Sequence, residues 1–187
     1  MRRGRGGPPP DDLAAFYADQ YDRVWAALTL FTGDRRLAEE LAQEAFVTTC
    51  QHWERVRTMD APGAWVHRVG INLAISRARR RRTELRVVQR EGSGAPSATS
   101  GADAGLGDEA VRAAVAGLPD DERAVVVLRF HADLSVADTA AALGVPGGTV
   151  KTRTRRALAR LRATGLAAAD DLVEVDAEAD ADAVTDR

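Results

Sequence analysis

The sequence predicts an all-α protein made of two small helical domains joined by a flexible linker. Apolar residues recur at three- and four-residue steps through the first part of the chain, a helix-turn-helix pattern stands near its end, and small residues fill the stretch between them. The 187 residues, 45% of them hydrophobic, suffice for two modest cores. We expect domains over 11–90 and 108–165, a linker over 91–107, and disordered segments over 1–10 and 166–187.

The first domain is expected to begin with two amphipathic helices. Asp11 or Asp12 can cap the first helix, because a carboxylate there accepts hydrogen bonds from free backbone amides. A second helix is expected over about 34–53, and residues 54–60 are expected to form a loop. The apolar stripe of the first helix comprises Leu13, Phe16, Tyr17, Val24, Trp25, Leu28 and Phe31.

A third helix follows, and it changes from an apolar core segment to a basic arm. Asp60 can cap it and Pro62 fits its first turn. The arm is the run RARRRR at 77–82. The single cysteine, Cys50, lies in the second helix, where we favour a small buried residue over a redox sensor.

Residues 134–161 have the pattern of a helix-turn-helix whose second helix is basic. Ser135 can cap the first helix, and residues 144–146, Gly-Val-Pro, end it. The expected inner face of the first helix consists of Ala137, Ala140, Ala141 and Leu143, and that of the second of Val150, Ala157, Leu158 and Leu161. Lysine and arginine remain for the outer face, so we expect this unit to bind DNA in the major groove.

Charge is divided sharply along the chain, although the total is only −2. Residues 63–90 carry eight Arg and one Glu, a net charge of +7, and residues 135–165 carry six basic residues and one Asp, a net charge of +5. Residues 166–187 carry eight acids and one Arg, a net charge of −7. Two separate surfaces for anionic partners are the simplest interpretation.

Other classes of protein are disfavoured. No apolar run approaches the ~20 residues that a membrane span needs, and the Arg-rich start leads into three prolines, so we expect a cytoplasmic protein. The three histidines lack metal-ligand spacing, and no nucleotide-binding loop or nucleophile beside a base is present. We therefore expect no metal, no cofactor and no enzymatic activity.

Four motifs together resemble the extracytoplasmic-function (group IV) sigma factors of the sigma-70 family, in particular the actinobacterial ones. They are TGDRRLAEELAQEAF at 32–46, PGAWVHRVGINLAISRARRRR at 62–82, LPDDERAVVVLRF at 118–130 and GTVKTRTRRAL at 148–158. The resemblance covers both domains and implies a region 2-like helical bundle followed by a region 4-like helix-turn-helix. It implies a protein that binds core RNA polymerase, recognises promoter DNA and supports promoter melting.

The resemblance assigns binding of the large polymerase subunits to the second helix. The residues implied are Glu40, Leu41, Gln43, Glu44 and Phe46. Relatives usually carry Asp at the position of Glu40. The alternative is that the acidic side chains form only a solvated face.

The resemblance assigns capture of the melted minus-ten strand to the third helix and to the loop 57–62 before it. The residues implied are Arg57, Asn72, Arg77, Arg79, Arg80, Arg81 and Arg82. The amide of Asn72 suits a base edge, although it can equally be a plain surface residue, and Trp65 is favoured as a core residue over a base-stacking one.

Recognition of the minus-thirty-five duplex is assigned to the last helix. Lys151, Thr152 and Arg155 are the candidates for base contacts. The candidates for phosphate contacts are the side chains of Arg153, Arg156 and Arg160 and the backbone near Gly148 and Thr149. Thr154 stands where relatives usually carry Leu or Ile, so looser or shifted packing is expected there.

The expected function is that of a monomeric transcription initiation factor, with core RNA polymerase and promoter DNA as partners and an anti-sigma factor as its regulator. The main alternative is a stand-alone helix-turn-helix regulator that binds operator DNA without polymerase. That alternative explains the helix-turn-helix but leaves the motifs at 32–46 and 62–82 without a role.

Overall fold

The computed structural model describes residues 12–90 and 109–165, and within these two ranges every regular element is a helix. The first range holds α1 (Leu13–Thr32), α2 (Arg35–Gln51), α3 (Trp53–Val56) and α4 (Pro62–Arg90). The second holds α5 (Glu109–Ala116), α6 (Asp120–Val126), the π-helical turn η1 (Val127–His131), α7 (Val136–Leu143) and α8 (Gly147–Ala163). The predicted all-α fold is confirmed. The expected linker and the two expected disordered segments lie outside the described residues.

Side-chain caps fix where the helices begin. Asp12, Asp34 and Ser135 each accept a hydrogen bond from a backbone amide two or three residues ahead, at 2.9–3.1 Å. Gly33 and Gly144 end α1 and α7 with φ of 70° and 64°, a left-handed conformation that costs glycine little. The caps at Asp12 and Ser135 and the stop at Gly144 agree with the sequence-based expectations.

Three local features differ from expectation. A four-residue helix, α3, occupies part of the expected loop over 54–60, because the backbone of 53–57 closes one more turn directly after α2. Helix α4 begins at Pro62, so Ala61 rather than Asp60 stands immediately before it. Cys50 is exposed, because it points away from the stripe by which α2 packs into the core.

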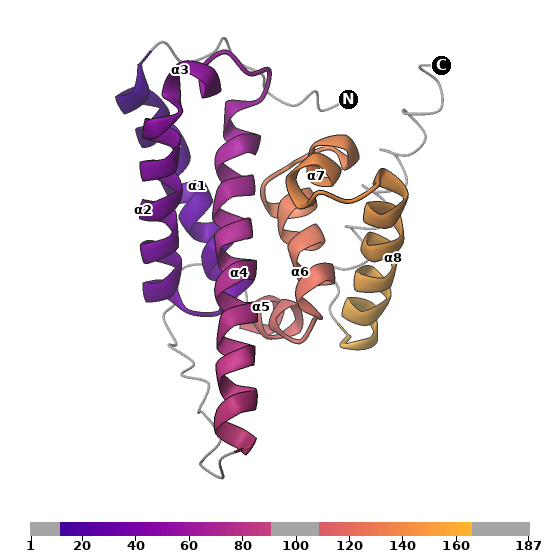
Figure 1. The fold of residues 1–187 in the computed structure, drawn as a ribbon. Coiled ribbons are helices and arrows are strands. Elements are labelled where there is room, and N and C mark those ends of the chain that lie inside the picture. The colour runs from indigo at the N-terminus through magenta and orange to yellow at the C-terminus, as the bar shows by residue number, and fades with distance from the viewer. Residues whose placement is uncertain (1–11, 91–108, 166–187) are drawn as a thin grey trace, which may run out of the picture.

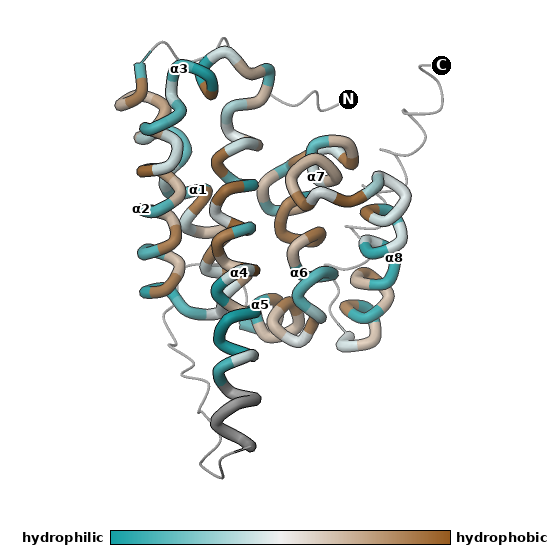
Figure 2. The backbone as a smooth tube through the Cα atoms, viewed as in Figure 1, coloured by the Kyte–Doolittle hydropathy of each residue, from teal (hydrophilic) through white to brown (hydrophobic). Residues whose placement is uncertain are grey.

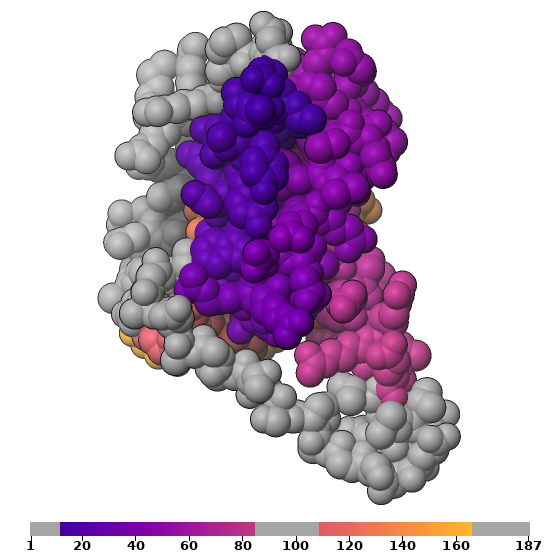
Figure 3. Space-filling model, turned by 90° about the vertical axis from the view of Figure 1, so that its left-hand side faces the viewer, coloured from indigo at the N-terminus to yellow at the C-terminus, as the bar shows by residue number. Residues whose placement is uncertain are grey.

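The first domain is a bundle of α1, α2 and α4 around a common apolar core (Figure 1). The first half of α4 contributes Val66, Ile71 and Ala74 to this core. Its second half turns hydrophilic and extends beyond the bundle (Figures 2 and 3). One helix therefore both anchors the domain and carries the basic arm outward.

In the second domain α6 packs against α8, which packs in turn against α7. The expected inner stripe of α8 is buried. Thr154 is buried beside it, and its hydroxyl donates to the carbonyl of Val150 at 2.9 Å. The threonine therefore keeps the core position without leaving its hydroxyl unpaired. In α7 the buried residues are Thr139 and Ala142. Of the expected inner face, Ala140 and Leu143 are half-buried, whereas Ala137 and Ala141 are exposed.

The two domains pack against each other. Helix α4 lies beside α7, and α1 contacts α5 and η1, so that the second domain covers the flank of α4 turned away from α2 (Figure 1). Most of the buried apolar residues of the two domains belong to a single cluster. Of the described helices, none is both long enough and apolar enough to cross a membrane.

Candidate protein-binding and nucleic-acid interfaces

Helix α2 presents a polar face to solvent and an apolar face to the core. Glu40, Gln43 and Glu44 are exposed, at the i, i+3 and i+4 spacing that puts them on one side of the helix. Leu41 and Phe46 are only 2% and 3% exposed. This differs from the expectation for these two residues, since their side chains fix the helix in the bundle and do not reach a partner.

The acidic face of α2 borders the basic arm of α4. One carboxylate oxygen of Glu40 lies 3.6 Å from Arg36, and the other lies 4.0 Å from Arg77. These ion pairs are solvated and each contributes less than about 1 kcal/mol to stability. Gln43 hydrogen-bonds with Tyr21 of α1, whereas Glu44 forms no ion pair with any described residue.

An aromatic patch next to this face was not anticipated from the sequence. Tyr17 of α1 stacks on Tyr21 at 4.9 Å and meets the ring of Phe46 edge-on at 4.8 Å, yet it is 43% exposed. Val47 of α2, the residue after Phe46, is 56% exposed. Periodicity placed Tyr17 in the core stripe, because a residue at the margin of a stripe has the same spacing as one at its centre.

The expected strand-binding residues lie along α4 and at the end of α3, but several already have partners. The side-chain amide of Asn72 donates to the carbonyl oxygen of Ala142 in α7, at 3.2 Å. Arg82 forms an ion pair with Asp120 of α6 at 2.8 Å, and Arg57 forms one with Glu54 at 2.9 Å. Arg79, Arg80 and Arg81 are the exposed arginines of the arm 77–82 that form no ion pair with any described residue.

Trp65 is half-buried against the core of the first domain, and its ring meets that of His52 edge-on, with the ring centroids 6.3 Å apart. This placement agrees with the packing role favoured from the sequence.

The outward ridge of α8 matches part of the expected duplex-reading set. Thr152, Arg155 and Arg156 are exposed, whereas Lys151 is half-buried. Two arginines expected to hold phosphates instead face α6 of the same domain. Arg153 lies 3.2 Å from Asp121, and Arg160 lies 2.9 Å from Glu122 in an ion pair whose geometry falls short of a hydrogen bond.

The amino-terminal end of α8 has no side chain that would keep a DNA phosphate away from its backbone. No side chain caps it, and a Cβ on Gly148 would have no atom within 4 Å. The amide of Thr149 already donates to the carbonyl of Pro146 at 2.9 Å, so this amide is not available to a phosphate as the sequence suggested. Gly148 remains the backbone group at the tip.

A buried histidine at the domain boundary was also missed. His67 of α4 is 4% exposed, and its Nδ1 has no hydrogen-bond partner among the described residues. Burial, together with the neighbouring charges of His131 and Arg23, lowers the pKa of His67 to about 4. Only the folded chain brings His67 and His131, from different domains, close together.

Taken together, an acidic helix face, a basic helical arm and a helix-turn-helix define a two-domain DNA-binding protein that also has a surface suited to a protein partner. Among the described residues, no cluster of His, Cys, Asp and Glu is arranged to hold a metal ion.

Comparison with known proteins gives the family. Residues 16–84 match the model for Sigma-70 region 2, and residues 114–163 match that for Sigma-70, region 4. The ECF RNA polymerase sigma factor SigL of Mycobacterium tuberculosis is 31% identical over 81% of this chain and 88% of its own length. The RNA polymerase sigma-E factor of Streptomyces coelicolor is 37% identical over 67% of this chain and 70% of its own length.

A solved structure of the sigma factor RpoE in complex with the anti-sigma factor NepR, from Bartonella quintana, has the same fold. The TM-score is 0.69 at 24% identity, over 83% of this chain and 97% of that one. This chain belongs to the extracytoplasmic-function sigma factors of the sigma-70 family, and it is accordingly an RNA polymerase sigma factor. The alternative of a stand-alone operator-binding regulator is not favoured.

Proposed function

We propose that the exposed face of α2 docks on the large subunits of core RNA polymerase. The observation that carries this assignment is the division of α2: Glu40, Gln43 and Glu44 point to solvent, while Leu41 and Phe46 hold the helix in the bundle. A rigid helix with a fixed polar face loses little conformational freedom on binding. The acidic face would attract a basic surface on the polymerase.

Helix α4 would hold the melted minus-ten strand. Removing a base from the duplex costs a few kcal/mol, which cationic side chains along the strand can offset. Arg79, Arg80 and Arg81 are exposed and supply these cations, and the amide of Asn72 supplies donors and an acceptor for a base edge. The arm extends beyond the bundle (Figure 3).

Helix α8 would read the minus-thirty-five duplex from the major groove. Thr152 and Arg155 lie on its outward ridge, Lys151 flanks them, and Gly148 lets the helix tip approach the backbone. Arg156 is placed for a phosphate, whereas Arg153 and Arg160 support the domain through α6.

In this scheme the polymerase performs the chemistry in the cytoplasm, and the sigma factor acts as a monomer with no cofactor. We also propose that the two domains comprise residues 11–90 and 108–165. Regulation by an anti-sigma partner is also part of it, and the RpoE–NepR complex offers a precedent in another sigma factor.

The test is binding of the full chain to purified core polymerase, followed by promoter-dependent run-off transcription. We expect submicromolar binding that is lost in Glu40→Lys/Glu44→Lys. Asp19→Lys/Asp22→Lys on α1 is the matched control, because it makes the same charge change at two exposed residues of another helix. Equal binding by both double variants would contradict docking through α2. Tight duplex binding without polymerase would favour an operator-binding regulator, and polymerase binding without transcription would favour an adaptor.

A further inference from the structure

An open groove of about 490 Å³ lies between the first turn of α2 and the basic arm of α4. The two helices pack side by side in the first domain (Figure 1). Four exposed arginines line the groove, Arg36 from α2 and Arg77, Arg80 and Arg81 from the arm. Guanidinium groups therefore lie on both walls of the groove.

The positions of these arginines along their helices suit an extended anion. Arg77 and Arg81 are four residues apart, about 6 Å along a helix, and Arg80 is three residues after Arg77, so the three share one side of α4. Arg36 lies in the first turn of α2, where the helix dipole favours negative charge. An anion that follows the groove would meet cations from two helices.

Two of the carboxylates in the groove are already engaged, but neither blocks the arginines. Asp34 caps α2, because its Oδ1 accepts hydrogen bonds from the backbone amides of Arg36 and Leu37 at 3.0 and 3.1 Å. Glu40 lies 3.6 Å from Arg36 and 4.0 Å from Arg77, which is too far for strong hydrogen bonds, and both ion pairs are solvated. One carboxylate held loosely between two guanidinium groups leaves donors free on each of them.

The third carboxylate is that of Glu84, so four arginines and three acids give the lining a formal charge of +1. Arg80 and Arg81 form no ion pair with any described residue. An anion whose oxygens are spread along the groove would therefore find donors on every arginine that lines it.

The lining favours the phosphates of a nucleic-acid strand over its bases. Of the described residues that line the groove, Leu37 is the only apolar one, so the groove has no ring on which a base could stack. Arginine, by contrast, can donate two parallel hydrogen bonds to one phosphate. Phosphate contacts of this kind position a strand without reading its sequence.

We propose that this groove binds the phosphodiester backbone of the melted strand, and that Arg36 holds a phosphate from the wall opposite the arm. This inference rests on the proposed function, because it adds a second helix to the site assigned to that strand. Helix α2 would contact the polymerase through its acidic face and the strand through its first turn. The strand would pass between α2 and α4, with Arg36 on one side and Arg80 and Arg81 on the other.

The salt dependence of strand binding tests the role of Arg36. Because the contact is independent of sequence, the probe is a fluorescein-labelled oligothymidylate of twenty nucleotides, titrated with the full chain at several salt concentrations. We expect Arg36→Gln to flatten the slope of log affinity against log salt by about 0.7 unit, the value for one phosphate of a single strand. Cations elsewhere in the chain, including those of α8, contribute equally to wild type and variant.

Arg35→Gln is the matched control, since it removes the same charge from the neighbouring residue. The guanidinium of Arg35 lies over the ring of Trp25, 4.7 Å from its centroid, and Arg35 does not line the groove. This variant should keep the slope of the wild type. Equal slopes in the two variants, or no binding of the oligothymidylate even at low salt, would overturn the proposal. Circular dichroism melting confirms that both variants are folded.

Cross-linking locates the strand without changing the charge of the arm. An azidophenacyl group is attached to Arg36→Cys, or to Asp22→Cys on an exposed part of α1, after Cys50 is replaced by serine. We expect the strand to cross-link to position 36 and not to position 22. Equal yields at the two positions would contradict a strand in the groove.

This proposal and the proposed function fail in different ways. If the chain does not bind core polymerase, the proposed function fails, while the oligothymidylate titration still reports on the groove. If the polymerase complex supports transcription and Arg36→Gln keeps the wild-type slope with both the oligothymidylate and the promoter, only the role of Arg36 is refuted. These promoter titrations use saturating core polymerase, so that any loss of docking in the variant does not enter the slope.

Discussion

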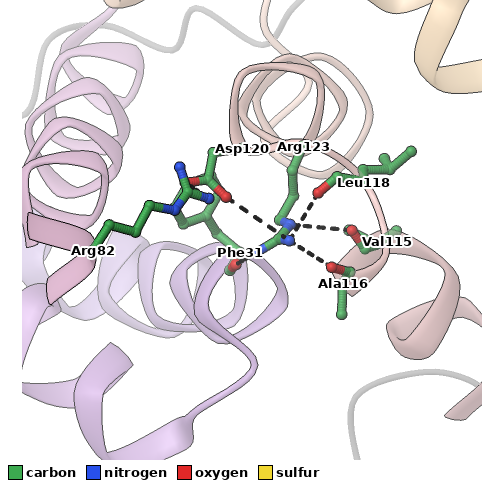
Figure 4. Close-up of polar contacts among 7 residues, drawn as sticks. All are labelled: Phe31, Arg82, Val115, Ala116, Leu118, Asp120 and Arg123. Carbon is green, nitrogen blue, oxygen red and sulfur yellow. Dashed lines mark hydrogen bonds and ion pairs between the residues drawn. The ribbon is translucent and has the colours of Figure 1, made fainter. Parts of the chain in front are cut away.

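The guanidinium of Arg123 in α6 donates a hydrogen bond to the carbonyl oxygen of Phe31 near the end of α1, at 3.0 Å. The same group donates to the carbonyls of Val115 and Leu118, at 3.1 and 2.8 Å, and to that of Ala116 (Figure 4). One side chain therefore ties the end of α5 and the start of α6 to the first domain. Burial lowers the pKa of this arginine and the nearby Asp120 opposes that shift, yet arginine keeps its charge at any working pH.

Replacing Arg123 with methionine should lower the free energy of unfolding by about 2–3 kcal/mol, because several carbonyls lose a charged donor in a partly buried site. Urea denaturation followed by circular dichroism measures the change. Arg68→Met, at an exposed position of α4, is the control and should stay within about 0.5 kcal/mol of the wild type. If the two variants lost the same small amount, Arg123 would not be the tie that the contacts indicate.

His67 should make stability depend on pH. Its pKa is lowered to about 4 in the folded protein, mainly by burial and further by His131 and Arg23, so the folded state holds it neutral. The stabilisation is present above the unfolded pKa of about 6.5 and is lost as pH falls toward 4. Between pH 7.5 and pH 5 this histidine should cost the folded state about 2 kcal/mol.

The measurement is a series of urea titrations at several pH values on the wild type and on His67→Phe. Carboxyl groups contribute to both profiles, so the informative quantity is the difference between them over pH 5–7.5. His52→Phe, at an exposed position, is the control and should follow the wild type. Parallel profiles for the wild type and His67→Phe would show that the buried histidine is not the source of the pH dependence of stability.

Sequence reasoning succeeds here where the determinants are local. Apolar spacing and capping residues such as Asp12 and Ser135 predict the helices, since both depend on residues within one or two turns. It misses α3, which is one turn long and has no stripe of its own. It also places Leu41 and Phe46 in a binding surface that they only support from within the core.

The contacts between the domains could not be predicted in this way. Asn72 and Ala142 are 70 residues apart, and no periodic pattern relates two such positions. The same limit applies to Asp121 and Glu122, which look like ordinary acids in the first turn of α6. Only the packing of α6 on α8 shows that they neutralise Arg153 and Arg160. A count of basic residues therefore overestimates the cations available to DNA.

Gly148→Ala should separate stability from DNA binding. The position lies in the first turn of α8, where an added Cβ would have no atom within 4 Å, so the fold does not require glycine there. Alanine should raise the free energy of unfolding by about 0.5–1 kcal/mol. If the helix tip approaches the DNA backbone closely, the same change should weaken promoter binding by the holoenzyme severalfold.

The readouts for Gly148→Ala are thermal unfolding of the free chain and promoter affinity of the polymerase complex. Gly147→Ala is the control, because its Cβ would make only an ordinary contact with Val136 inside the domain. Unchanged promoter affinity in Gly148→Ala would remove the tip of α8 from the interface.

Arg156 and Arg160 lie one helical turn apart on α8 and should respond differently to alanine. Arg160 pairs with Glu122, whose side chain is 8% exposed, so Arg160→Ala leaves a buried carboxylate without its cation and should destabilise the domain by about 1–3 kcal/mol. Arg156 is exposed, so Arg156→Ala should change stability by less than about 0.5 kcal/mol.

For DNA binding the order should be the opposite: Arg156→Ala should have the larger effect and Arg160→Ala the smaller. Each phosphate contact contributes about one unit to the slope of log affinity against log salt, so Arg156→Ala should flatten that slope by about one unit in the polymerase complex. Arg160→Ala should leave the slope unchanged at temperatures where the variant is folded. Equal flattening by both variants would mean that Arg160 leaves Glu122 for a phosphate when DNA binds, and the ion pair between α6 and α8 would then be a feature of the free protein alone.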